Sequence, residues 1–151
     1  MNKPNKFAQL QVVITKNNLK FRKPKMLSMY LVAGIVGVMI FFSVAVAPTI
    51  FKVLPQEWAG AYVRQFFPKY YFVLGFSCVI AGIFAQSLQL KVITFVCAML
   101  FAISLWVLTP AVNKAKDENN IKKFNVLHVV SVAVNMIILL ALIYCFWIKN
   151  E

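Results

Sequence analysis

The chain has 151 residues, of which 62% are hydrophobic and 13% are charged, and its mean hydropathy is +0.78. Soluble globular proteins are about 45–50% apolar and about 25% charged. This composition therefore excludes a soluble domain and indicates that lipid is the solvent for most side chains. The net charge is +12, from 16 basic and 4 acidic residues, and the basic residues lie outside the long apolar runs.

Residues 1–25 form a basic leader with seven Lys and Arg side chains and no acid. Cations beside a membrane are attracted to anionic headgroups by about 1 kcal/mol each, so the leader is predicted to contact the bilayer surface and not nucleic acid. Phe7, Leu10, Val13 and Ile14 recur at helical spacing, as in a helix that lies in the interface. The β-branched run 12–15 disfavours a helix, so the leader is either interfacial helix or disordered.

Four apolar segments are long enough to cross the hydrocarbon core of a bilayer, which takes about 20 residues. They lie at about 26–47, 70–86, 92–112 and 124–148 and form one transmembrane domain over residues 26–148. Ala45-Val46-Ala47 is similar to a signal-peptidase site, but the apolar run is longer than a signal sequence and Pro48 follows directly. The first segment is predicted to be retained, and the fold class is all-α, an integral membrane antiparallel four-helix bundle.

The connections predict how the segments are oriented. A short connection at 86–91 requires an antiparallel hairpin between the second and third segments. Longer connections are predicted at 51–69 and 113–123, on the opposite side of the membrane. Because the first segment usually dominates orientation and its leader is densely basic, both termini are predicted to be cytoplasmic in the cell (inner) membrane.

The polar residues near the apolar segments gather on the side with the long connections. Pro48 and Pro110 are predicted to close the first and third segments as structural residues. His128, Ser131 and Asn135 share one stripe of the fourth segment, which should face the protein because lipid cannot satisfy these groups. The stripe serves either interhelical hydrogen bonding or a ligand pocket centred on His128. The candidate ligand-binding residues are His128, Asn135, Ser131, Arg64, Tyr70 and Asp117.

Metal and cofactor chemistry has few residues to draw on. His128 is the only histidine, so two histidines of one chain cannot ligate a haem. Met136 points away from the His128 stripe, and Cys78, Cys97 and Cys145 form no C-x-x-C pair. No cofactor is expected, with haem or copper on a single His as the alternative.

The sequence favours a non-enzymatic protein, because it has no G-x-S-x-G, H-E-x-x-H or P-loop motif and few acid–base groups. The leading hypothesis is binding of a small ligand, in transport or stress resistance. The alternatives are a haem- or copper-binding protein and a structural subunit of a larger membrane complex. Small residues at 33, 34 and 37 and at 75, 81 and 82 predict close packing within one chain, or a homo-oligomer seam.

Two segments resemble one known family. Residues 44–71 and 109–135 are similar to the small four-span membrane proteins typified by transmembrane protein 205, a family of unknown function. The matching positions are Pro48, Phe51, Gly60, Tyr70, Pro110, Asp117, His128 and Asn135. The resemblance implies no catalytic activity and implies a role in transport or trafficking. It extends distantly to four-span copper-resistance and haem-handling proteins, although this chain lacks the first-span histidine of the haem-handling kind.

Overall fold

The computed structural model describes residues 7, 11 and 27–147, and residues 27–147 form four long helices. The first helix, Leu27–Val53, contains a π-helical segment η1 (Phe42–Val46) and then α2 (Ala47–Val53). The second is α3 (Gln56–Phe84). The third, Leu88–Asp117, consists of α4 (Leu88–Ile103), π-helical η2 (Ser104–Leu108) and α5 (Thr109–Asp117), and the fourth is α6 (Ile121–Tyr144). The basic leader lies outside the described residues, apart from Phe7 and Gln11.

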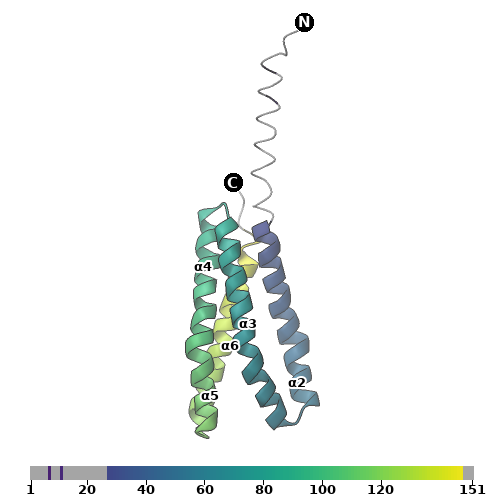
Figure 1. Ribbon diagram of the computed structural model, residues 1–151, viewed down its shortest axis with the longest axis vertical. Coiled ribbons are helices and arrows are strands. Elements are labelled where there is room, and N and C mark those ends of the chain that lie inside the picture. Colours follow the sequence, from purple (N-terminus) through teal and green to yellow (C-terminus); the bar gives the residue numbers. More distant parts are fainter. Residues whose placement is uncertain (1–6, 8–10, 12–26, 148–151) are drawn as a thin grey trace.

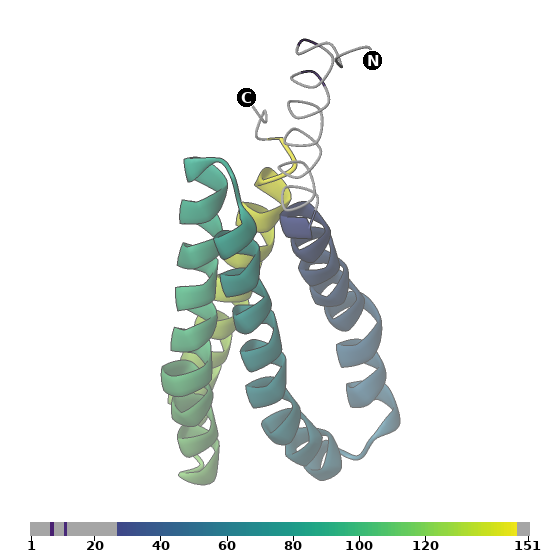
Figure 2. The same cartoon turned by 45° about the horizontal axis from the view of Figure 1, so that its top comes forward.

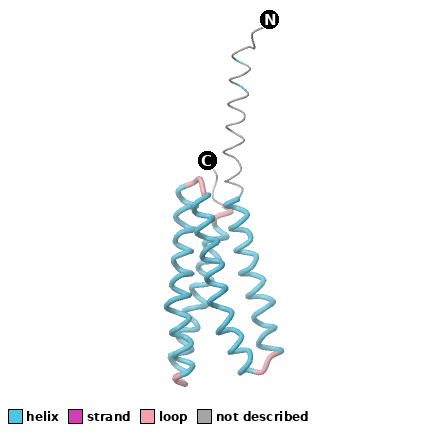
Figure 3. The backbone as a smooth tube through the Cα atoms, in the orientation of Figure 1, coloured by secondary structure: helices cyan, strands magenta, loops and turns pink. Residues whose placement is uncertain are grey.

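All four helices are long and apolar enough to cross a membrane, and residues 27–147 contain no strand. The predicted all-α membrane fold is therefore confirmed. Successive helices run in opposite directions (Figures 1 and 3). The first helix begins and α6 ends at the same end as connection 85–87, which we call the terminal end (Figure 1). Connections 54–55 and 118–120 lie at the opposite, distal end.

The two connections predicted to be long are short, because the helices continue through most of them. Of residues 51–69 only 54–55 are non-helical, and of residues 113–123 only 118–120 are. Asn120 starts α6, since its side-chain oxygen accepts a hydrogen bond from the Lys123 N–H at 3.0 Å. Charged residues do not interrupt a helix, so hydropathy located the apolar parts of these helices and not their ends.

Pro48 and Pro110 do not close helices as predicted; each lies two residues beyond a π-helical segment, and the helix continues. A proline has no N–H to donate to the preceding turn. Around it the backbone widens, so that the Ala47 N–H bonds to Phe42 O and the Thr109 N–H bonds to Ser104 O. A threonine hydroxyl also donates to the backbone of each widened turn, Thr49 to Ala45 O and Thr109 to Ser104 O.

The packed core lies in the half of the molecule toward the terminal end. The buried residues there come from all four helices, for example Met39, Cys78, Phe101 and Leu142. Toward the distal end burial is sparse: α2 has no buried residue, and those of α6 are confined to its second half. The helices diverge toward the distal end (Figure 2). The fold is thus closed at one end and open at the other.

Glycines bring α3 and α4 together, as the small residues predicted. A Cβ at Gly82 would lie 2.8 Å from Thr94 Oγ1, and one at Gly75 would lie 3.1 Å from Phe101 Cβ. Ser28 of the first helix donates to Ala81 O of α3 at 2.7 Å. Gly34 and Gly37 differ, because nothing within the described part of the chain lies within 4 Å of a Cβ added there. They make no close helix contact within residues 27–147.

Candidate functional site

A cleft of about 360 Å³ occupies the distal half, between α2 and α3 on one side and α5 and α6 on the other. Each helix contributes one stripe of residues at helical spacing. Gly60, Arg64, Phe67 and Tyr71 come from α3, and Thr109, Asn113 and Lys116 come from α5. The stripe of α3 runs over twelve residues, from Gly60 to Tyr71, which is a rise of roughly 16 Å. The volume falls in the range of small-ligand pockets.

The α6 wall of the cleft is the stripe that the sequence singled out. His128, Ser131 and Asn135 all line the cleft, as predicted for residues that must avoid lipid. Ser131 Oγ donates to the Leu127 carbonyl of its own helix at 2.9 Å. The His128 ring stacks on Phe124 at 5.9 Å and has no hydrogen-bond partner within residues 27–147. Interhelical hydrogen bonding therefore explains neither of these two residues.

Asn135 is the polar residue of the stripe that contacts another helix. Its Nδ2 donates to the Tyr71 hydroxyl of α3 at 3.4 Å, while its buried Oδ1 has no partner among the described residues. A buried amide atom without a hydrogen bond costs roughly 1–3 kcal/mol. The inner part of the cleft thus keeps an unused hydrogen-bonding group.

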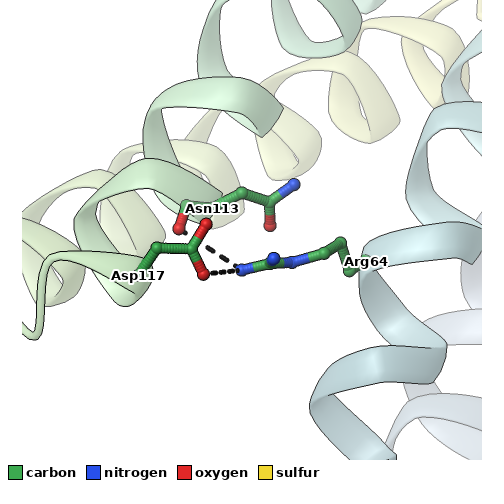
Figure 4. A network of polar contacts seen from close by, with 3 residues as sticks. All are labelled: Arg64, Asn113 and Asp117. Atoms are coloured by element: carbon green, nitrogen blue, oxygen red, sulfur yellow. Dashed lines mark hydrogen bonds and ion pairs between the residues drawn. The ribbon is translucent and has the colours of Figure 1, made fainter.

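A charged pair lies at the distal end of the cleft. Arg64 Nη2 of α3 lies 2.6 Å from Asp117 Oδ1 of α5, and the same nitrogen donates to Asn113 O at 3.4 Å (Figure 4). Arg64 and Asp117, both candidates from the sequence, are therefore brought together across two helices. Their side chains are 41% and 60% exposed, so the pair contributes little to stability, about 0–1 kcal/mol. Arg64 lines the cleft and Asp117 does not.

Tyr70, a candidate from the sequence, lies outside the cleft. It is 6% exposed and packs on Phe42 at 5.1 Å and on Phe67 at 6.0 Å. Its neighbour Tyr71 lines the cleft instead. Adjacent helical residues point about 100° apart, and of the two tyrosines it is Tyr71 that is turned toward the cleft.

Sequence reasoning missed most of the residues that line the cleft, among them the polar residues Tyr71, Asn113 and Lys116. The signal for Tyr71 was its spacing: Arg64, Phe67 and Tyr71 follow at i, i+3 and i+7, which is one helical face. Asn113 and Lys116 were assigned to a loop, where spacing carries no information. Once the third helix is extended to Asp117, their three-residue separation places both on the face of Thr109.

The side chains that could ligate a metal do not cluster within residues 27–147. Within the described residues, no three His, Cys, Asp or Glu side chains are placed to hold one metal ion. Cys78, Cys97 and Cys145 are free thiols buried in the core near the terminal end. Among the described residues that line the cleft, His128 has a side chain that commonly ligates metals, and no Cys, Asp or Glu lines it.

Comparison with known proteins places this architecture in one family. Residues 30–121, from the first helix to the start of α6, match the family described as "Domain of unknown function (DUF4149)". An uncharacterized protein of Aquifex aeolicus (strain VF5) is 42% identical over 57 residues, which is 38% of this chain and 41% of that protein. The match thus spans about two-fifths of that relative's length. No solved structure matches. The chain belongs to the DUF4149 family, whose function is unknown.

Proposed function

We propose that this protein is a non-enzymatic integral membrane protein that binds a small ligand in the distal cleft, in the service of transport or stress resistance. One observation carries the proposal. Polar side chains of three helices converge on a single, mainly apolar cleft in the half of the molecule that lacks a packed core. Apolar walls with a few placed polar groups are typical of small-ligand sites.

The resemblance to the transmembrane protein 205 type supports the same site. Four of its eight matching positions, Phe51, Gly60, His128 and Asn135, line the cleft. A fifth, Asp117, is paired with the cleft residue Arg64. We infer that this finer family relationship holds and that its implied role in transport or trafficking is exercised through the cleft.

We assign the cleft no catalytic step and no resident cofactor. Every polar side chain of residues 27–147 that lines it carries an N–H or O–H group, from two cations, two amides, three hydroxyls and one imidazole, and none of them is a carboxylate. Such a set suits recognition of an electron-rich group on a ligand. The absorbance spectrum and metal content of the purified protein test this assignment. A haem band or stoichiometric copper would contradict it and favour the cofactor-binding alternative.

Occupying the cleft with protein atoms tests the binding function. Ser131→Phe places a ring in the cleft, because Ser131 lines it and bonds only to its own helix. Ala133→Phe is the matched control, since Ala133 is exposed on another face of α6. Both variants add the same aromatic group to the same helix two residues apart.

Native mass spectrometry after gentle extraction from the membrane provides the measurement. We expect the wild type and Ala133→Phe to retain a bound species that Ser131→Phe lacks. Equal occupancy in all three proteins would place the ligand elsewhere and overturn the proposal. Thermal unfolding of the three in the same detergent separates loss of binding from loss of fold.

A further inference from the structure

The cleft carries an excess of positive charge at its distal mouth. Two cations, Arg64 and Lys116, line it, whereas no Asp or Glu side chain of the described residues does. Asp117, which does not line the cleft, is paired with Arg64. Lys114 pairs with Glu118 at 3.8 Å, away from the cleft. Lys116 has no ion-pair partner within residues 27–147, so its charge is available to a ligand.

Gly60 leaves space for the end of the Lys116 side chain. A Cβ at Gly60 would collide with the Lys116 ammonium, so this side chain extends from α5 onto the surface of α3. Gly60 and Arg64 are one helical turn apart on α3 and line the same wall. The ammonium and the guanidinium therefore lie at the same end of the cleft, where they can act together on one anion.

The depth of these cations matches the boundary between hydrocarbon and headgroups. The third helix is uncharged from Val92 to Asn113, which is 22 residues or roughly 33 Å of helix, and Lys116 follows this segment. On α3, Arg64 lies on the distal side of Lys69, outside the uncharged part of that helix. The hydrocarbon core of a bilayer is also about 30 Å thick. With the uncharged helix segments in hydrocarbon, Arg64 and Lys116 reach the headgroup level, and the cleft extends from there toward the bilayer centre.

The cleft is also open sideways. α2 and α6 both line it, yet no Cα pair between the two helices lies within 8 Å. Phe51 of α2 and Val132 of α6, residues of the two facing walls, are both exposed. A molecule in the surrounding membrane can therefore enter between these helices without first passing through water.

We propose that the ligand of the cleft is a membrane lipid with an anionic phosphate headgroup. The phosphate is held between Arg64 and Lys116, and an acyl chain lies along Phe42, Phe67 and Val112. Arginine and lysine are the side chains that bind phosphate most strongly, and the cleft places both beside apolar walls. This inference rests on the proposed function and names its ligand class.

Binding of phosphatidylglycerol to the full-length protein tests the inference, with phosphatidylcholine as the lipid of no net charge. In a native mass spectrometry titration we expect Lys116→Gln to weaken phosphatidylglycerol binding about fivefold, which corresponds to about 1 kcal/mol for one cation near a headgroup. Lys114→Gln is the control: it removes the same charge from the same helix outside the cleft and should change affinity less than twofold. Equal effects of the two variants would show general surface attraction and overturn the inference.

One further variant and one competition experiment test the same inference. Asp117→Asn releases Arg64 from its ion pair, so we expect phosphatidylglycerol to bind several-fold more tightly; unchanged or weaker binding counts against the inference. Glycerol phosphate carries the headgroup without chains. If it displaces the lipid at equal concentration, the natural ligand is a soluble anion and the lipid assignment is wrong.

The Ser131→Phe variant distinguishes the two levels of the proposal. If it removes a bound species while Lys116→Gln leaves phosphatidylglycerol affinity unchanged, the cleft binds a ligand of another class and only this inference fails. If phosphatidylglycerol binds equally well to Ser131→Phe and Ala133→Phe, the cleft is not the site and both proposals fail.

Discussion

The carboxamide of Asn135 on α6 lies 3.4 Å from the hydroxyl of Tyr71 on α3, and this contact joins two cleft walls that diverge beyond it. The remaining amide atom of Asn135 is buried without a partner in the described structure. Stability has therefore been given up at this point of the cleft, as is common where a protein binds a ligand.

Substitutions at these two residues should reveal that cost. Tyr71→Phe leaves the whole Asn135 carboxamide unpaired, so we expect a loss of about 1 kcal/mol in the free energy of unfolding. Asn135→Leu removes the unpaired group, and the double variant should recover most of the loss while binding ligand poorly. Equilibrium unfolding in detergent measures the cycle. Strictly additive losses would show that the two side chains do not interact.

His128→Gln should separate binding from stability. The imidazole is exposed, stacks on Phe124 and has no hydrogen bond within the described residues. Because the imidazole makes few contacts that stabilise the fold, we expect the free energy of unfolding to change by less than about 0.5 kcal/mol. Occupancy of the cleft should fall. A residue with a purely structural role would instead lose stability and binding together.

Paired glycines test the packing of α3 on α4. A methyl group at Gly82 meets Thr94 Oγ1, which is held by bonds to Leu90 O and Lys91 O, so it cannot move aside easily. We expect Gly82→Ala to destabilise the protein by about 1–3 kcal/mol. Gly37→Ala meets nothing within 4 Å and should be neutral or stabilising in thermal unfolding.

Light scattering of the Gly37 variant addresses the homo-oligomer seam. If Gly34 and Gly37 pack against a second copy, Gly37→Leu will lower the oligomer mass without unfolding the monomer. The same mass as the wild type would leave these glycines as lipid-facing residues.

The sequence predicts the four helices well because each carries a long run without charge, from which lipid-facing structure follows directly. It fails at the helix ends. Lys52, Arg64 and Lys114 lie on continuous helix, although they were predicted to lie in the connections 51–69 and 113–123. The prediction that Pro48 and Pro110 end their helices was wrong, because the widened turns at η1 and η2 let the helices continue.

The candidate site was predicted in part. Asn135, Ser131 and His128 are one stripe of a helix whose register is clear, so their common direction followed from spacing alone. Arg64 and Asp117 are 53 residues apart, and only the fold brings them to 2.6 Å. The choice of Tyr70 over Tyr71 depended on the rotation of α3 about its axis, which neither hydropathy nor charge determines.

Removing a proline should alter the cleft more than the fold. Pro110→Ala restores an N–H, so the preceding turn can close as regular α-helix and lose its extra residue. The residues that follow, including Asn113 and Lys116, would turn by about 100° away from the cleft. We expect equal or higher thermal stability, because a proline inside a helix costs about 3 kcal/mol, and weaker phosphatidylglycerol binding.

Pro68→Ala is the control for this substitution. Pro68 lies inside α3, does not line the cleft and follows no π-helical segment. Its replacement should leave binding unchanged. Equal binding by the Pro110 and Pro68 variants would mean that the widened turn does not position the α5 wall.

Labelling of single introduced cysteines tests the orientation of the protein. The basic leader predicts a cytoplasmic terminal end, which puts the distal cleft on the other face of the membrane. Glu118→Cys, in the distal connection 118–120, should then react with a membrane-impermeant maleimide in intact cells. Gln89→Cys, exposed near the terminal end, should react only after permeabilisation. The native cysteines are buried in the core and provide a low background. The reverse pattern would place Arg64 and Lys116 at the cytoplasmic leaflet, so the lipid held by the cleft would have to come from that leaflet.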